Sequence, residues 1–404
     1  MASSARQILA RLESTTSPPQ PAALPGEILR EILLRVASHG DLARASAACV
    51  AFHQIIADDD FLRRYRSLHP PLLLGFLDGG EFRRAEPPHP SEPVGRVLAR
   101  AADFDFDSYV PRDGWHGWGT SDVRDGLVLL TYGPWIRRDG SLGVFPDLAV
   151  CDPLSHRYRL LPPIPNGLLA SIQVNQPNIK SFSASIVPSR VGEADTTFRV
   201  MGMTQCPKKF AVFIFSSING SWSVAASTTW EALGLDAPQN GRVLDYRHNS
   251  FAYGCLYRKV FQKNKLLKFN LSTLEFSTVE LPPKHDELEI VIVEAGQGRL
   301  GVVSQINAQQ IRYWIRQNGG PNAWEWKMSN INPLPVDYYF SFIVGALGGY
   351  VFILGQSNRN PMEAACFSIE IKTFDIDRVG RMMGFLHNIF PYFGYPPSMS
   401  PRRI

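Results

Sequence analysis

The chain has 404 residues, more than a single ordinary domain holds, so two or three domains or one large repeat array are expected. Its 41 lysines and arginines against 37 aspartates and glutamates leave a formal charge of +4, which argues against a dedicated polyanion-binding protein. Apolar residues make up 45%, enough for a large core, and the 32 glycines and 31 prolines are typical of short strands joined by tight turns.

The cysteines are few and widely spaced, and no C-x-x-C pair occurs among Cys49, Cys151, Cys206, Cys255 and Cys366. This spacing disfavours a zinc knuckle or a redox site. An odd, sparse set is typical of reduced thiols in an intracellular protein, and residues 1–13 lack the apolar core of a signal peptide. We therefore expect an intracellular protein of the nucleus or cytoplasm and no bound metal.

The first part of the chain has helical signals. Residues 1–21 form a predicted flexible leader, because residues 14–21 consist of Ser, Thr, Pro and Gln. Pro25 then suits the first turn of a helix, whose apolar stripe has spacings of three and four up to Gly40. That stripe consists of Ile28, Leu29, Ile32, Leu33 and Val36.

Two further helices are predicted in this region. Asp41 is a plausible N-cap for the second, and residues 58–60 offer caps for a short third helix that begins at Phe61, Leu62 and Tyr65. The apolar stripe of the second helix consists of Leu42, Ala45, Cys49, Phe52 and Ile56. A unit of about 45 residues is marginally stable alone, so its second apolar face needs a partner, either the rest of the chain or another protein.

The segment from Leu24-Pro25 to Val36 resembles the opening of an F-box, and the run from Asp41-Leu42 to Phe52, with the closing Phe61-Leu62, matches the rest of that pattern. Phe52 stands where the family usually has Trp. The resemblance implies a three-helix F-box domain over 22–66. It also implies binding to the Skp-type linker protein of SCF ubiquitin ligases, which docks on a cullin scaffold. The linker-binding residues that it implies are Leu24, Pro25, Ile28, Leu29, Ile32, Leu33, Val36, Leu42, Cys49 and Phe52.

Beyond a predicted linker at 67–98, helical periodicity gives way to short apolar runs separated by Gly, Pro, Asn and Asp, which predict strands. Examples are Leu127–Thr131, Val212–Ser216, Leu266–Leu271, Glu289–Val293 and Ala365–Ile371. Because no long helical run lies between them, a parallel α/β sheet is disfavoured.

A hairpin pattern recurs among these strands: a polar residue opens it, Ser, Thr or Asn lies in the turn, and a large apolar residue restarts the next strand. Copies are Asp152–Tyr158, Ser216–Trp222, Asn270–Phe276 and Glu370–Ile376, with a degenerate one near Tyr313–Trp326. A period near ~50 residues predicts an all-β propeller of about six blades over 99–390, followed by a flexible tail at 391–404.

Two further segments resemble blade strands of the kelch-like and F-box-associated domains that follow the F-box in plant F-box proteins. They are Arg124–Leu130, and Gly298–Val303 with Ile311–Trp314. The expected fold is therefore an α+β multidomain chain, a small all-α F-box followed by an all-β propeller.

The segment Tyr338–Asn358 carries no charged residue, so a membrane span is one interpretation. Its glycines favour a hairpin instead, with strands at Phe340–Ala346 and Tyr350–Gly355 around a turn at Leu347–Gly349.

Motifs of catalysis are absent: there is no Walker A loop, dinucleotide fingerprint, nucleophile elbow or H-E-x-x-H. The alternating Asp103–Asp107 is better explained as a half-buried strand than as a calcium loop, because Ser108 replaces the required Gly. Trp115–Gly119 is either a ligand rim or blade packing.

We predict a non-catalytic substrate receptor of an SCF-type ubiquitin ligase, with no cofactor, in which the F-box binds the linker protein and the propeller binds a target protein. The residues that bind the target stay undefined, and neither nucleic acid nor a membrane is an expected partner. The alternatives are an enzyme built on a propeller, which needs clustered acids or metal ligands at its channel, and an F-box scaffold outside any ligase.

Overall fold

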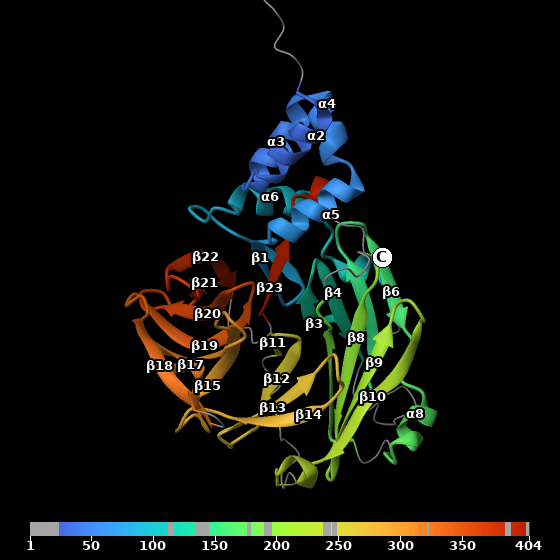
Figure 1. Cartoon of the computed structure of the whole chain (residues 1–404), viewed down its shortest axis with the longest axis vertical. Helices are drawn as coiled ribbons and strands as arrows, with labels where there is room; N and C mark the ends of the chain where they lie inside the picture. Colours follow the sequence, from blue (N-terminus) through green and yellow to red (C-terminus); the bar gives the residue numbers. More distant parts are fainter. Residues whose placement is uncertain are drawn as a thin grey trace, which may run out of the picture. The chain divides into compact units, whose positions relative to one another are not determined.

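A computed structural model describes residues 24–111, 117–133, 145–175, 179–189, 196–236, 244, 249–320, 323–383, 389–400 and 404. The chain divides into two compact units, residues 1–70 and residues 71–404. The described part of the first unit is helical, and the second is built from small antiparallel sheets (Figure 1).

Within its described residues the first unit has four helices, not the three predicted: α2 (Gly26–Leu34), α3 (His39–Ala48), α4 (Val50–Ile56) and α5 (Asp59–Leu68). The predicted second helix is broken at Cys49, whose extended backbone (φ −148°, ψ 132°) ends α3 and precedes α4. Cys and Val have low helix propensity, so the break falls where Cys49 meets Val50.

The helix caps confirm one prediction and correct another. Asp58 caps α5 as predicted, because its carboxylate accepts a hydrogen bond from the Phe61 N–H at 2.9 Å. The cap of α3 is Ser38, not Asp41: the Asp41 N–H donates to Ser38 Oγ at 3.2 Å. Asp41 lies in the first turn of α3, where a negative charge favours the helix dipole.

A small core holds the four helices together. Its buried apolar residues are Leu33, Leu34, Leu42, Ile56, Phe61, Leu62 and Tyr65. The Tyr65 ring stacks on Phe61 with centroids 6.1 Å apart, and its hydroxyl donates to the Val36 carbonyl at 2.8 Å. Tyr65 therefore ties α5 to the end of α2.

The described part of the second unit forms six sheets, which are the blades of a propeller. Blade 1 is β3 (Gly119–Arg124), β4 (Leu127–Tyr132), β5 (Asp147–Asp152) and β6 (Arg157–Leu161). Blade 2 is β7 (Ser181–Ile186), β8 (Arg199–Gln205), β9 (Lys209–Ser216) and β10 (Ser221–Thr229). Blade 3 is β11 (Ser250–Ala252), β12 (Cys255–Lys259), β13 (Lys265–Asn270) and β14 (Phe276–Glu280).

Blade 4 is β15 (Glu289–Glu294), β16 (Leu300–Asn307), β17 (Gln310–Gly320) and β18 (Ala323–Pro333). Blade 5 is β19 (Tyr338–Leu347), β20 (Tyr350–Ser357), β21 (Glu363–Glu370) and β22 (Ile376–Met383). In each of these five sheets the strands pair antiparallel in chain order. The predicted propeller of about six blades is thus confirmed.

Blade 6 combines strands from the two ends of the unit. Its order is β2 (Glu81–Arg84), β1 (Leu72–Asp78), β23 (Ile389–Gly394), and the early and late strands lie side by side in Figure 1. β1 and β23 pair antiparallel from Leu72 opposite Gly394 to Asp78 opposite Ile389. Because β23 also contacts β3 and β19, it joins the last blade to the first and closes the ring.

This closure corrects two predicted boundaries. The predicted linker 67–98 contains β1, β2 and most of α6 (Glu92–Ala101), and the predicted tail 391–404 contains most of β23 and η3 (Pro397–Met399). Helix α6 lies directly on β1, where a Cβ atom at Gly95 would come within 2.6 Å of the Leu74 carbonyl oxygen.

The predicted hairpin repeat corresponds to the turn between the third and fourth strands of a blade. In all four regular copies the fifth residue has a positive φ: His156 (52°), Gly220 (65°), Leu274 (59°) and Phe374 (63°). The opening residue supports the turn; for example, Asn270 Oδ1 accepts hydrogen bonds from the Ser272 and Thr273 N–H groups at 2.8 and 3.1 Å.

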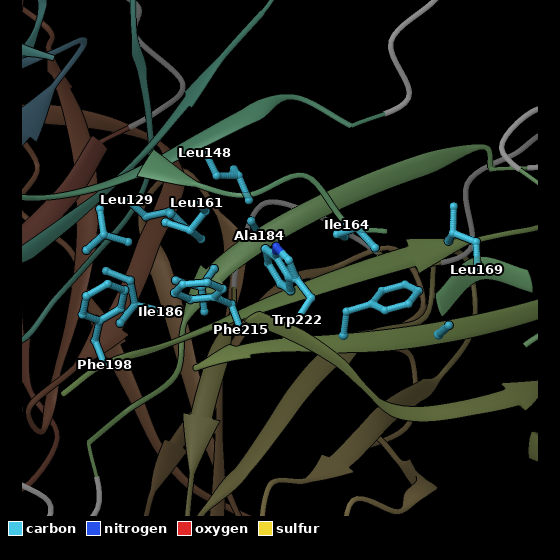
Figure 2. Packing of buried hydrophobic residues seen from close by; sticks show 14 of the residues in the cluster. Leu129, Leu148, Leu161, Ile164, Leu169, Ala184, Ile186, Phe198, Phe215 and Trp222 are labelled. Carbon is cyan, nitrogen blue, oxygen red and sulfur yellow. The ribbon is translucent and has the colours of Figure 1, made fainter. Parts of the chain in front are cut away.

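Apolar side chains fill the spaces between neighbouring blades. Figure 2 shows the cluster between blades 1 and 2, in which Leu129 and Leu148 of blade 1 meet Phe215 and Trp222 of blade 2. The Trp222 indole N–H donates to the Pro162 carbonyl at 2.7 Å, so this large ring is buried without an unpaired donor. Short helical segments α8 (Asn166–Ser171) and η2 (Glu231–Leu233) lie in the connections.

The uncharged segment forms the predicted hairpin of β19 and β20, with Leu347 opposite Tyr350. Its two turn residues, Gly348 and Gly349, both have positive φ (62° and 85°), which glycine adopts without strain. In the described part of the chain, no helix is both long and apolar enough to cross a bilayer.

The predicted strand at Asp103–Asp107 is wrong. The Asp105 N–H donates to Asp103 Oδ1 at 2.8 Å, a local turn that ends extended structure, and α7 (Phe106–Tyr109) follows. The alternating phenylalanines are still packed, since Phe106 is buried and Phe104 stacks on Phe82 at 4.5 Å.

Candidate functional site

The most prominent exposed apolar feature of the helical unit lies along α2. Leu24, Ile28 and Ile32 are 50%, 48% and 48% exposed, although each is a large aliphatic residue. Ile28 and Ile32, four residues apart, lie one above the other on a single face of α2, and Leu24 lies two residues before the helix begins. We call these three residues the α2 stripe.

Contacts with α5 fix the opposite side of α2. Arg30 donates to the Asp58 carboxylate at 2.9 Å, and Arg64 donates to Glu31 at 2.6 Å. The Arg30 guanidinium also lies 5.6 Å from the centroid of the Phe61 ring. The Phe61 N–H and Arg30 together hold the pKa of Asp58 below its ordinary value. Through these contacts one side of α2 packs against α5, and the α2 stripe stays exposed to solvent.

The structure sorts the predicted linker-binding residues into three groups. Exposed members are Leu24, Pro25, Ile28, Ile32 and Cys49. Half-buried members are Leu29, Val36 and Phe52. Leu33 and Leu42 are buried, at 4% and 0% exposure, and are therefore core residues rather than parts of an exposed contact surface.

The sequence pattern does not predict two exposed apolar residues of the helical unit, Val50 and Leu68. Val50, the first residue of α4, is 74% exposed. The sequence predicts a single, unbroken second helix, and the apolar stripe of that helix includes Cys49 but not Val50. The sequence therefore does not predict Val50 as a surface apolar residue. The low helix propensity of Cys49 and Val50 is the signal that could have revealed the break.

The aromatic segment proposed as a ligand rim is only partly observed. Trp115 and His116 lie outside the described residues. Trp118 packs against Tyr132 with ring centroids 5.2 Å apart, inside the apolar cluster between blades 6 and 1. For Trp118 the packing interpretation therefore holds.

Polar side chains on the innermost strands connect neighbouring blades. The Asp122 carboxylate of β3 accepts a hydrogen bond from the Ile186 N–H of β7 at 2.8 Å, and burial raises the pKa of this group. Ser250 of β11 accepts from the Ile292 N–H of β15 at 3.1 Å. Among the described residues, no group of three or more His, Cys, Asp or Glu side chains has the geometry of a metal site.

The comparisons with known proteins give one sequence relative. Over 156 residues the chain is 28% identical to an F-box protein of Arabidopsis thaliana. The match covers 37% of this chain and 33% of that protein, so the chain spans about a third of the length of the curated relative it matches. No known family profile matches the chain.

Among solved structures, the propeller is similar to the SapL1 lectin in complex with α-methyl fucoside, with a TM-score of 0.36 and 10% identity over 67% of this chain and 82% of that one. It is also similar to the Aleuria aurantia lectin, described as a six-bladed β-propeller, with a TM-score of 0.33 and 12% identity over 67% and 77%. An oligogalacturonate lyase in complex with manganese has a TM-score of 0.34 and 9% identity over 65% of each chain. The six-bladed architecture given above comes from the strand pairings of this chain.

Proposed function

We propose that this protein is a substrate receptor of an SCF-type ubiquitin ligase, acting in the nucleus or cytoplasm. The helical unit binds a Skp-type linker protein, and the propeller holds a target protein. The observation that carries this proposal is the α2 stripe, an exposed apolar row within the segment that has the F-box pattern. The match to an Arabidopsis thaliana F-box protein supports it.

The energetics of the stripe fit a binding role. Leu24, Ile28 and Ile32 each keep about half of their surface in water, so a partner that covers them removes that apolar area from solvent. At roughly 25 cal/mol per Å², covering half of such a side chain contributes about 1 kcal/mol. Three neighbouring residues then supply a compact apolar centre for an interface.

The propeller is suited to hold a target without chemistry of its own. A ring closed by β23 presents its connecting loops from a rigid frame, and loops on a rigid scaffold are common binding sites. In this proposal the chain acts by raising the effective concentration of the target near the ligase and forms no covalent intermediate.

Affinity purification tests the proposal. The full-length chain should recover both a Skp-type linker protein and a cullin, and a chain lacking residues 22–66 should recover neither. Recovery of the linker protein without a cullin would support the alternative of a scaffold outside the ligase. Equal recovery of cullin by both chains would contradict the assignment of the helical unit.

A point variant separates binding from folding. Ile28→Lys with Ile32→Lys places two charges on the stripe without touching the buried core, so the linker protein should be lost while the melting profile is kept. Val336→Lys is the matched control, because Val336 is 80% exposed and belongs to the propeller. The control should recover as much linker protein as the unmodified chain.

A further inference from the structure

Three rings meet inside the helical unit. They are His39, the first residue of α3, Tyr65 of α5, and His69, which follows the last residue of α5. Between ring centroids, Tyr65 lies 5.6 Å from His39, edge-on, and 4.3 Å from His69. The two histidine rings are 6.3 Å apart. We call these three residues the ring cluster.

The ring cluster ties the ends of the helices together. His69 Nε2 lies 2.7 Å from the carbonyl oxygen of Leu34, the last residue of α2, and it must be the donor because a carbonyl only accepts. The His39 ring is hydrogen-bonded to the backbone of Pro70, and since proline has no N–H, the ring donates to the Pro70 carbonyl. The amino end of α3 and the carboxyl end of α2 are therefore both held at the end of α5 through histidine rings.

The place that His39 occupies suits a neutral ring. Its side chain is only 4% exposed, and it lies at the amino end of α3, where the helix dipole disfavours a positive charge. Burial is the main cause that lowers the pKa of His39, and His69 lowers it further, while the hydrogen bond to Pro70 opposes the shift. A proton on His39 would thus create a charge that has lost its water and lies beside a second histidine.

The other titratable groups around His39 come from α3 and α5. Burial is the main cause that raises the pKa of Tyr65 to about 12, and Asp41 in the first turn of α3 raises it further, so the Tyr65 hydroxyl stays neutral at pH 7 and below. The hydrogen bond from Arg44 is the main cause that holds the pKa of Asp41 below 3.8, so Asp41 stays charged at pH 5.5. Between pH 7.5 and 5.5 the ring cluster therefore changes charge only at its histidines.

Relief of a buried charge at this point requires that the ring reach water. We propose that the ring cluster is a pH-sensitive switch of the helical unit, in which a protonated His39 leaves its place beside Tyr65 and releases the amino end of α3 from the end of α5. Above pH 6.5 the closed form is fully stabilised. As the pH falls below 6.5, the open form binds a proton that the closed form does not, so the open form gains population. The switch lies in the unit that carries the α2 stripe, but it needs no partner and is independent of the proposed function.

Hydrogen exchange of the full-length protein tests the switch. Amide exchange in peptides from α3 and α5 is followed by mass spectrometry at pH 7.5 and pH 5.5, and each rate is divided by that of an unstructured peptide at the same pH. One pH unit below the ordinary pKa of histidine, a single proton can favour the open form up to about tenfold. Protection of α3 and of the end of α5 should therefore fall by about 3- to 10-fold at pH 5.5.

One variant and a matched control assign the effect to His39. His39→Asn keeps an N–H that can donate to the Pro70 carbonyl but does not titrate, so its protection should be the same at both pH values. His53→Asn is the control, because His53 is an exposed histidine of α4 outside the ring cluster, and it should keep the full fall. An unchanged protection in the unmodified protein, or an equal fall in His39→Asn, would overturn the proposal.

A second measurement decides the case in which His39→Asn does not fold. In the unmodified protein, the ring resonance of His39 is followed by nuclear magnetic resonance with labelled histidine while the pH is lowered. The ring should take up its proton below pH 6.5, over the same pH range in which α3 loses protection. Proton uptake at or above pH 6.5, or proton uptake without loss of protection, would overturn the proposal.

Discussion

The helical unit and the propeller differ in how completely they bury their large apolar side chains. The propeller packs its large side chains into clusters between neighbouring blades, and residues such as Phe76 and Phe213 have no exposure at all. The helical unit buries Leu33 and Phe61 but leaves the α2 stripe about half exposed. A ring can bury both faces of every sheet within itself, whereas a unit of about 45 residues has too little interior to do so.

The largest expected effect concerns closure of the ring. A fragment of residues 71–404 keeps β1 and β2, while a fragment of residues 95–404 loses both and leaves β23 without its partner. Unpaired strand edges are templates for aggregation. The longer fragment should be soluble and melt cooperatively, as measured by circular dichroism, and the shorter one should be insoluble. This differs from the boundary near 99 that the sequence predicts, and a soluble shorter fragment would show that closure through blade 6 is dispensable.

Two neighbouring residues of α2 sharpen the contrast between core and stripe. Leu33→Ala removes a buried side chain and should lower the free energy of unfolding of the helical unit by roughly 2–5 kcal/mol. Ile32→Ala removes a half-exposed side chain and should cost about 1 kcal/mol or less. Urea unfolding followed by helical circular dichroism in full-length chains gives both values. Equal losses would mean that the stripe is part of the core.

Two helical glycines offer a matched test of packing in the two units. Gly95→Ala in α6 should destabilise the propeller by about 1–3 kcal/mol, because the new Cβ would lie 2.6 Å from the Leu74 carbonyl oxygen. Gly26→Ala in α2 has no atom within 4 Å of its new Cβ and should leave stability unchanged or raise it by up to about 1 kcal/mol. The midpoints of urea unfolding of the two variants and of the unmodified chain measure these changes in stability. A neutral Gly95→Ala would contradict the close packing of α6 on β1.

The response of the propeller to acid follows from two histidines, the half-buried His89 and the buried His285. Burial lowers the pKa of His89 and of His285 below the ordinary value near 6.5. Above pH 6.5 both histidines are neutral in the folded and in the unfolded chain, so their contribution to the stability of the propeller is fully present. As the pH falls below this value, the unfolded chain binds protons that the folded chain does not, so stability decreases. The urea midpoint of residues 71–404 should fall between pH 7.5 and pH 5.5. His285→Asn should show a smaller fall, and an unchanged pH dependence in that variant would exclude His285 as a contributor.

Local signals explain what the sequence predicts correctly. The hairpin of β19 and β20 is recognisable because Gly348 and Gly349 supply two positive φ values in succession. The third-to-fourth strand turns are recognisable because residues such as Asn270 support them with short-range hydrogen bonds. Each of these features depends on a few consecutive residues.

Closure of the ring depends on residues that are far apart in the sequence, so local sequence patterns do not predict it. The partner of Leu72 is Gly394, at the other end of the unit. Even so, the apolar run Leu72–Leu77 before Gly79-Gly80 is a strand and turn signal that argues against a linker. At the candidate site, spacing alone predicts that Ile32 and Leu33 belong to one stripe. Contacts with α5, such as that of Arg30 with Asp58, decide which of them is exposed.

We propose that the α2 stripe binds a Skp-type linker protein. Isothermal titration of purified linker protein into the purified full-length chain tests it directly. We predict saturable binding that Ile28→Lys with Ile32→Lys weakens at least ~100-fold, since each disrupted apolar contact at an interface centre costs about 1 kcal/mol or more. Val336→Lys should bind as tightly as the unmodified chain. No binding by the unmodified chain, or equal binding by the stripe variant, would contradict the claim.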